Sequence, residues 1–122
     1  MDVSLRSAMF ERLHVPRMFV LFCKEWLGLS SRHTQYLWRA LSHSQHTRVI
    51  AMRTAIQCSD ALPYHREGLE HFARHHLAPQ GLVAVLDILV EDQTLTRQEV
   101  NSYQDAVLRC VDQHGRWKEE SG

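Results

Sequence analysis

The chain has 122 residues, of which 44% are hydrophobic and 23% are charged, as is ordinary for one globular domain with its own core. Its 14 Lys and Arg residues are balanced by 14 Asp and Glu residues. This balance excludes the high net charge of a disordered chain, and it argues against nucleic acid or an anionic membrane as a partner. We therefore expect one domain over residues 1–122, with loosely ordered ends at 1–14 and 116–122.

The basic and acidic residues are unevenly distributed along the chain. Residues 1–58 contain eight basic and three acidic residues, whereas residues 59–122 contain six basic and eleven acidic residues. Two interpretations are open. The opposite charges could orient a partner or a second copy of the chain, or the two halves could pack against each other.

The cysteines and the apolar runs predict where the protein resides. Cys23, Cys58 and Cys110 are odd in number and far apart, which is typical of free thiols in a reducing compartment. The apolar run over residues 18–23 begins too late for a signal peptide and is far shorter than the roughly 20 residues that span a membrane. We expect a cytoplasmic protein with no membrane contact.

Sparse Gly and Pro and abundant Leu, Ala, Arg, Glu and Gln predict helix throughout. The first helix is expected to begin at Pro16 and to end near Gly28. Apolar residues lie on nearly every side of this helix, so most of its surface must be buried. The next helical stretch runs from residue 30 or 31 to about residue 58, and the polar segment 42–47 leaves open whether it is one helix or two.

Three further helices are predicted in the second half of the chain. One covers residues 63–77 with Asp60 as its cap. A short apolar helix covers residues 82–90 after the punctuation Pro79-Gln80-Gly81. The sequence Thr96-Arg97-Gln98-Glu99 is a capping box that begins the last helix. The prediction is an all-α fold, a single-domain irregular bundle of about five helices.

Residues 20–39 have the spacing of a helix-turn-helix, in which a small residue makes the turn and apolar anchors hold the second helix. Gly28 would make the turn, and Thr34 and Leu37 would be the anchors. The side chains that would face phosphates and base edges are Arg32, His33, Gln35, Tyr36 and Arg39. Lys24 stands where a small apolar residue is usual, and Thr34 is a poor anchor. A glycine turn before a capped helix is also an ordinary connection. DNA binding is therefore the alternative function.

One helix face carries a weak metal-binding pattern. Glu67, His71 and His75 are spaced i, i+4, i+8, and two histidines four apart with a carboxylate can hold zinc. A solvated face with Glu–His pairs explains the same spacing, and neither an H-E-x-x-H motif nor a Cys pair supports a site. We expect no metal and no other cofactor.

No motif in the chain indicates catalysis. The sequence lacks the G-x-S-x-G nucleophile turn, the phosphate-binding P-loop and the dinucleotide-binding glycine pattern. Three Cys and nine His residues make chance pairings easy, and none has a local signature. We expect a protein that is not an enzyme.

Aromatic residues gather in the first third of the chain. So short a chain has little interior for all of them, and aromatic residues and Met mixed with Arg are typical of interfaces. The predicted protein-interface residues are Met18, Phe19, Phe22, Trp26 and Trp38. The other interpretation is that they form the core.

The predicted function is that of a small regulatory protein that binds another protein, such as an inhibitor (anti-activator) or adaptor of a transcription factor. An apolar helix would cover the working surface of the partner. We also expect a homodimer. A helix-turn-helix DNA-binding regulator ranks second, and a metal-binding protein or enzyme ranks third.

Overall fold

The structure is a computed structural model that describes residues 14–118. Six α-helices make up most of this part of the chain, which confirms the predicted all-α fold. The helices are α2 (Arg17–Leu21), α3 (Ser31–His43), α4 (Thr47–Cys58), α5 (Arg66–His75), α6 (Pro79–Glu91) and α7 (Arg97–Arg109). A π-helical turn η1 (Phe22–Trp26) follows α2, and a 3-10 turn η2 (Ser59–Ala61) follows α4.

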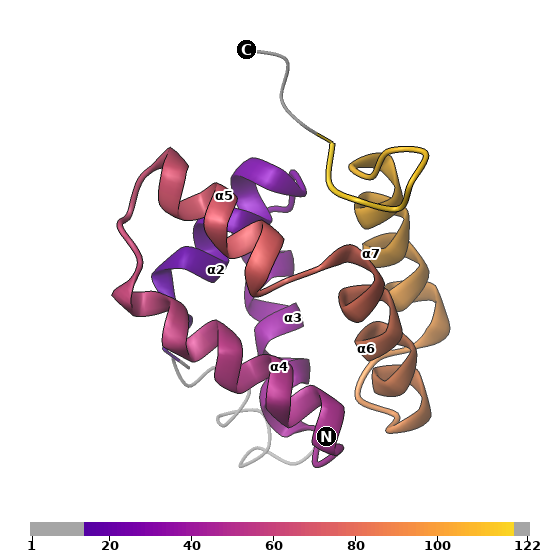
Figure 1. The fold of residues 1–122 in the computed structure, drawn as a ribbon. Helices are drawn as coiled ribbons and strands as arrows, with labels where there is room; N and C mark the ends of the chain where they lie inside the picture. Colours follow the sequence, from indigo (N-terminus) through magenta and orange to yellow (C-terminus); the bar gives the residue numbers. More distant parts are fainter. Residues whose placement is uncertain (1–13, 119–122) are drawn as a thin grey trace.

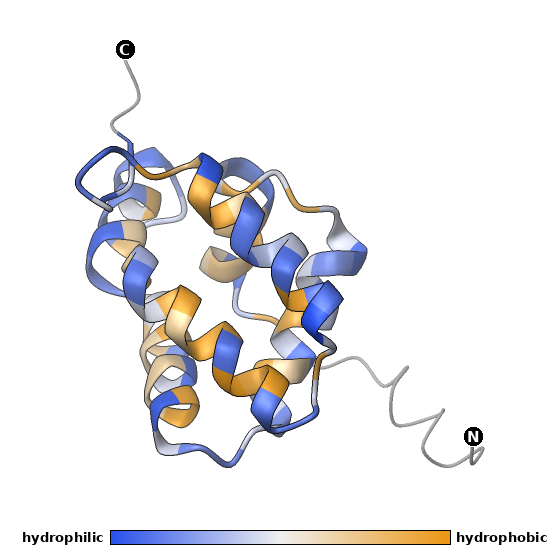
Figure 2. Cartoon of the chain, turned by 90° about the vertical axis from the view of Figure 1, so that its right-hand side faces the viewer, coloured by the Kyte–Doolittle hydropathy of each residue, from blue (hydrophilic) through white to orange (hydrophobic). Residues whose placement is uncertain are grey.

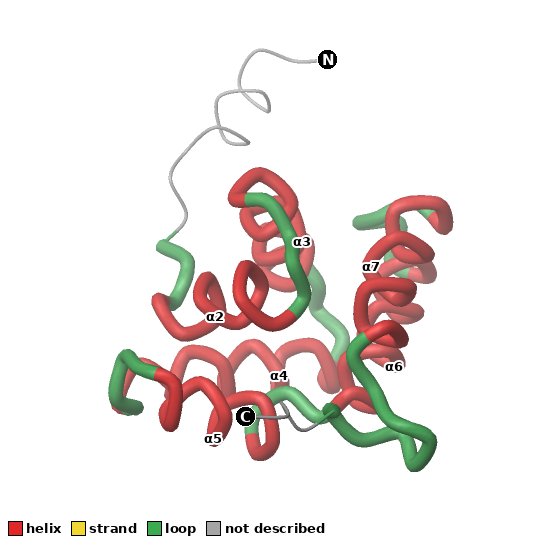
Figure 3. The backbone as a smooth tube through the Cα atoms, turned by 90° about the horizontal axis from the view of Figure 1, so that it is seen from above, coloured by secondary structure: helices red, strands yellow, loops and turns green. Residues whose placement is uncertain are grey.

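The helices are arranged as a hairpin beside a group of four. Figure 1 shows α6 and α7 side by side along one edge, with α2 to α5 on the other side. In the view from above, α3 lies between α2 and the α6–α7 pair (Figure 3). Each helix carries both apolar and hydrophilic segments (Figure 2), as expected when its apolar side faces its neighbours.

One continuous core joins both groups of helices. Its largest fully buried side chains are Met18, Phe19, Phe22, Leu37, Leu41, Val49, Ile56, Phe72, Leu77, Leu82, Leu86 and Leu89. These residues come from α2, η1, α3, α4, α5, α6 and the connection after α5. Each contributes roughly 1.5–3 kcal/mol through the removal of its apolar surface from water.

The polar segment 42–47 separates two helices. Arg53 of α4 donates hydrogen bonds through Nη1 to the carbonyl oxygens of Leu41 and Ser42, at 2.7 and 2.9 Å. A cation is favourable there because the last carbonyls of a helix carry partial negative charge. The Ser44 hydroxyl donates to the Asp92 carboxylate, which holds the connection against the end of α6.

Two predicted helix beginnings are wrong. Asp60 does not cap α5, because it lies in η2 and the chain makes a further turn before the helix begins. His65 is the cap instead, and its Nδ1 accepts a hydrogen bond from the Glu67 amide at 3.2 Å. The segment 79–81 is the first turn of α6 rather than punctuation, because Pro79 occupies a first-turn position where its missing N–H costs nothing.

The last helix begins as predicted. The Thr96 hydroxyl accepts from the Glu99 amide at 3.1 Å, and the Glu99 carboxylate accepts from the Thr96 amide at 2.9 Å. These two reciprocal bonds confirm the capping box.

The expectation of a loose C-terminal tail is wrong for residues 116–118. Trp117 is 7% exposed, and its Nε1 donates to the carbonyl oxygens of Ala73 and Leu77, both at 2.8 Å. Burial of an indole ring is favourable when its N–H also finds a hydrogen-bond acceptor, as it does here. The rest of that expectation concerns residues 119–122 and 1–13, which lie outside the described residues.

Candidate functional site

Four of the five predicted interface residues belong to the core. Met18 is 2% exposed, Phe19 and Phe22 are fully buried, and Trp38 is 3% exposed. The prediction that these four side chains contact a partner is therefore wrong. The physical reason is that α3, α5 and the C-terminal loop enclose the helix and cover its apolar sides, so no second chain is needed to do so.

Trp26 is the exception among the predicted interface residues, because it is only half-buried. One side of its ring contacts the core, with the Phe22 and Trp117 ring centroids each 6.2 Å away. Trp26 also lines a groove of about 240 Å³ between α2–η1 and the beginning of α5. We call this the η1–α5 groove, and its lining residues are Leu21, Glu25, Trp26, Tyr64, His65, Arg66 and Leu69.

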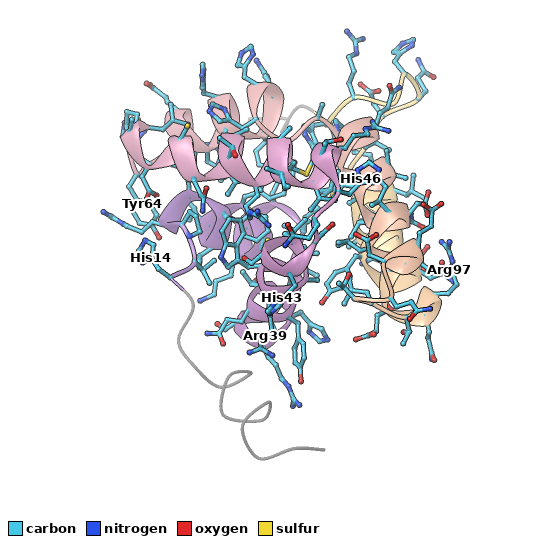
Figure 4. All side chains as sticks on the ribbon, turned by 90° about the horizontal axis from the view of Figure 1, so that it is seen from below. His14, Arg39, His43, His46, Tyr64 and Arg97 are labelled. Atoms are coloured by element: carbon cyan, nitrogen blue, oxygen red, sulfur yellow. The ribbon has the colours of Figure 1, made fainter. Side chains whose placement is uncertain are left out.

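Tyr64 forms the exposed side of the η1–α5 groove. Its side chain is 51% exposed, and the Arg17 guanidinium carbon lies 4.3 Å from its ring centroid. Figure 4 shows Tyr64 at one edge of the molecule, near His14. Sequence patterns did not single out Tyr64, because a lone tyrosine in a loop has no periodicity to mark it.

Local backbone geometry creates the groove. Helix α2 changes to a π-helical turn at Phe22, so the Leu27 amide donates to the Phe22 carbonyl five residues earlier, at 3.2 Å. On the other wall, a Cβ atom on Gly68 would lie 1.8 Å from the Pro63 carbonyl oxygen. Only glycine at this position lets the loop that carries Tyr64 pack directly on α5.

Charges of both signs surround the groove. Arg66 forms an ion pair with Glu70 one helical turn away, with 3.5 Å between Nε and Oε1 and side chains 65% and 42% exposed. Glu25 lines the opposite wall. Such a rim can orient a partner but adds little affinity, because exposed ion pairs contribute roughly 0–1 kcal/mol.

The second predicted site, on α3, has the glycine turn and the two buried residues that the sequence pattern required. Gly28 has a φ of +69°, as the turn requires, and the anchors Thr34 and Leu37 are each 1% exposed. Thr34 is an effective anchor because its hydroxyl donates to the Ser30 carbonyl at 2.9 Å while the side chain contacts Cys23 of η1. Burial raises the pKa of the Cys23 thiol, so it stays protonated.

The predicted contact residues lie on the outer side of α3. Arg32, His33 and Gln35 are exposed, whereas Tyr36 and Arg39 are half-buried. The Arg32 and Arg39 guanidinium carbons lie 5.8 and 5.4 Å from the Tyr36 ring centroid. The structure therefore brings these side chains to one surface, although Lys24 remains exposed rather than packed in the corner.

Helix α7 supports the beginning of α3. The Tyr103 hydroxyl donates to the His33 carbonyl at 3.2 Å. Burial, with a further contribution from the nearby Glu99 carboxylate, raises the pKa of Tyr103 to about 12. The hydroxyl therefore remains a donor well above neutral pH.

The histidine face of α5 does not assemble the candidate metal site. The His71 and His75 ring centroids are 4.5 Å apart, and Glu67 is exposed on the same helix. Within residues 14–118, no group of three or more His, Cys, Asp or Glu side chains is arranged to hold a metal ion. His76 lies beside the pair, and burial followed by the charges of His71 and His75 lowers its pKa.

A serine, an aspartate and two histidines meet between the α3–α4 connection and the end of α6. They line a cavity of about 390 Å³, whose lining residues are His43, Ser44, Gln45, His46, Asp92 and Thr94. The Ser44 hydroxyl is 1% exposed and donates to Asp92, while His46 Nδ1 accepts from the Arg48 amide. The Ser44 hydroxyl thus donates its proton to Asp92 and accepts from the His46 amide, so a carboxylate and a backbone N–H hold it in place of an imidazole base.

Comparisons with protein-family models, curated proteins and solved structures found no match for this chain. None of the helices in the described range is long and apolar enough to cross a lipid bilayer. The η1–α5 groove and the outer side of α3 are the two candidate functional surfaces.

Proposed function

We propose that this protein is a small non-enzymatic regulator that binds another protein, and that the η1–α5 groove receives the partner. The observation that carries the proposal is the composition of the groove. Trp26, Tyr64 and Arg66 line one depression, and these three residue types are the most enriched at the energetic centres of protein interfaces.

The size of the groove defines the kind of partner. At about 240 Å³ it is smaller than the roughly 300–1,000 Å³ of pockets that enclose drug-sized ligands. It suits one or two apolar side chains that project from a partner's helix or loop. Trp26 needs little ordering on binding, because one side of its ring already rests on Phe22 and Trp117.

The partner class proposed from the sequence is a transcription factor, on which the protein would act as an inhibitor or adaptor. The transcription factor would contact Trp26 and Tyr64, because Phe22, which the sequence predicted as a contact, is buried. The regulator would insert no helix of its own. It would instead receive an apolar side chain from the working surface of the transcription factor.

The test compares two substitutions at exposed apolar positions. Tyr64→Glu places a charge at the groove, and Leu108→Glu places the same charge on α7, where Leu108 is 59% exposed. We expect tagged wild type and Leu108→Glu to retain the same host protein and to change the same reporter gene, while Tyr64→Glu does neither. Equal behaviour of the two variants would contradict the groove as the binding site.

A second copy of the chain is one partner that the groove could receive, as the homodimer prediction requires. Light scattering of the wild type and of Tyr64→Glu separates the cases. A wild-type dimer that becomes a monomer in Tyr64→Glu makes the second copy the occupant. A wild-type monomer contradicts the homodimer and leaves a different protein as the partner.

A further inference from the structure

The outer side of α3 is a second surface, which the η1–α5 groove does not use. Arg32, Gln35, Tyr36 and Arg39 follow one another at spacings of three, one and three residues, so they form one stripe along the helix. We call this the α3 stripe. We propose that the α3 stripe binds double-stranded DNA, with α3 lying in the major groove.

The corner between η1 and α3 presents the stripe to a ligand. Thr34 and Leu37 hold the inner side of α3 in the core, and the positive φ of Gly28 turns the chain sharply before the helix begins. With 13 residues, α3 is about 20 Å long. A helix of this kind fits the major groove, which is about 12 Å wide.

Acidic residues are absent from the segment that carries the stripe. No Asp or Glu occurs in the sequence between Glu25 and Asp60, which includes all of α3 and α4. The zero net charge of the chain is therefore a sum over two unlike regions. A phosphate backbone near α3 meets no carboxylate from α3 or α4, the two helices of this segment.

The side chains of the stripe match the edges of base pairs. Arginine pairs with the two major-groove acceptors of guanine, and glutamine pairs with the donor and acceptor of adenine. Tyr36 lies between the guanidinium groups of Arg32 and Arg39, at 5.8 and 5.4 Å from their central carbons. These cation–π contacts restrict both arginines before binding and so reduce the entropy that is lost in the complex.

The composition of this surface favours DNA over an acidic protein. Among the described residues, the large hydrophobic side chains that are exposed are Tyr64 and Leu108, and neither belongs to α3. Tyr36 is already half-buried beside the two arginines, so the stripe offers a protein no exposed apolar centre, whereas a DNA interface can be polar and cationic throughout. Figure 4 shows Arg39 and His43 well apart from Tyr64, so the two proposed surfaces are separate.

The stripe contains two cationic side chains, Arg32 and Arg39, and this small number limits the expected affinity for DNA. Binding that neutralises two phosphates gives a slope of about −2 in the logarithm of affinity against the logarithm of salt concentration. The dissociation constant of one chain should lie on the order of 10 μM at moderate salt. Arg53 is not counted, because it donates to the last carbonyls of α3.

The experiment measures binding of a fluorescent random-sequence duplex by anisotropy over a range of salt concentrations. Arg32→Ala/Arg39→Ala should weaken binding at least about tenfold and remove most of the salt slope. The control Arg97→Ala/Arg116→Ala removes the same charge from exposed positions elsewhere and should bind within about twofold of the wild type. Because part of Arg39 is buried, Arg32→Ala/Gln35→Ala, which changes only exposed residues, is the second test variant.

Three outcomes would overturn the proposal. The first is that the wild type binds no duplex at low salt, and the second is that the control loses as much affinity as the stripe variants. The third is tighter binding of poly-glutamate than of the duplex, which would make an acidic protein the ligand. Tyr64→Glu should bind the duplex normally, so failure of the protein-binding proposal leaves this one standing, and the reverse also holds.

Discussion

Two consecutive helical segments, α2–η1 and α3, differ in how far the rest of the chain covers them. The first is apolar on nearly every side and was expected to contact a partner, yet Phe19 and Phe22 are fully buried. The second is strongly one-sided, and its polar side is open to solvent. The Gly28 turn is all that separates the two segments.

The comparison shows what an apolar helix does and does not reveal. Apolar residues around a whole helix require that it be covered, but they do not say by what. Here the cover is internal, since Phe72 of α5 and Trp117 of the C-terminal loop contact Phe22 at centroid distances of 5.5 and 5.6 Å. Where that cover ends, Leu21 and Trp26 are half-buried and line the η1–α5 groove.

The largest expected effect comes from removing the centre of this cover. Phe22→Ala should lower the free energy of unfolding by about 4 kcal/mol, because it deletes a buried ring and leaves a cavity among three aromatic neighbours. Urea denaturation followed by circular dichroism measures the change. A loss in the free energy of unfolding below about 1 kcal/mol would show that Phe22 is exposed, and would contradict the burial of α2–η1.

Trp117→Phe tests whether the C-terminal loop is part of the same core. The substitution keeps an aromatic ring but removes the indole donor, leaving the Ala73 and Leu77 carbonyl oxygens without it. We expect a loss of about 2 kcal/mol in the free energy of unfolding. An unchanged melting curve would mean that the loop is loose in solution, as the sequence had suggested.

Tyr103→Phe tests the support of α3 by α7 and should cost about 1 kcal/mol, the usual worth of one hydrogen bond. The pKa of Tyr103 is raised from 10.0 to about 12, so the folded state keeps the proton longer than the unfolded state does. The stability linked to this proton is complete below pH 10 and is lost as the pH rises through about 12. Thermal melts at alkaline pH should show this decline in the wild type but not in Tyr103→Phe.

The smallest effect is expected on α3 itself. Arg32→Ala should change the free energy of unfolding by no more than about 0.5 kcal/mol, because the side chain is exposed and surface substitutions seldom change stability by more. Urea denaturation beside Phe22→Ala gives the contrast directly. A loss as large as that of Phe22→Ala would show that the α3 stripe is structural and not available to a ligand.

Sequence reasoning succeeded where a structure depends on neighbours along the chain. The capping box at Thr96 and the apolar anchor Leu37 are local features, and both are found in the structure. The sequence left open whether segment 42–47 breaks the helix and indicated that Thr34 is a poor anchor, whereas the structure separates α3 from α4 there and buries Thr34. Sequence reasoning failed for the cap of α5 and for Trp117. The cap of α5 depends on the path of the chain through an irregular connection. The burial of Trp117 depends on hydrogen-bond acceptors more than 35 residues away in the sequence.

The sequence by itself determined that this protein is an all-α domain, and it placed most of the helices by periodicity, caps and turn residues. Only the tertiary structure decided which apolar residues are core and which remain partly exposed. Phe22 and Trp26 are four residues apart and both aromatic, yet one is enclosed and the other borders the η1–α5 groove. The burial of a side chain depends on contacts with residues that are distant in the sequence, and a local sequence pattern does not contain those contacts.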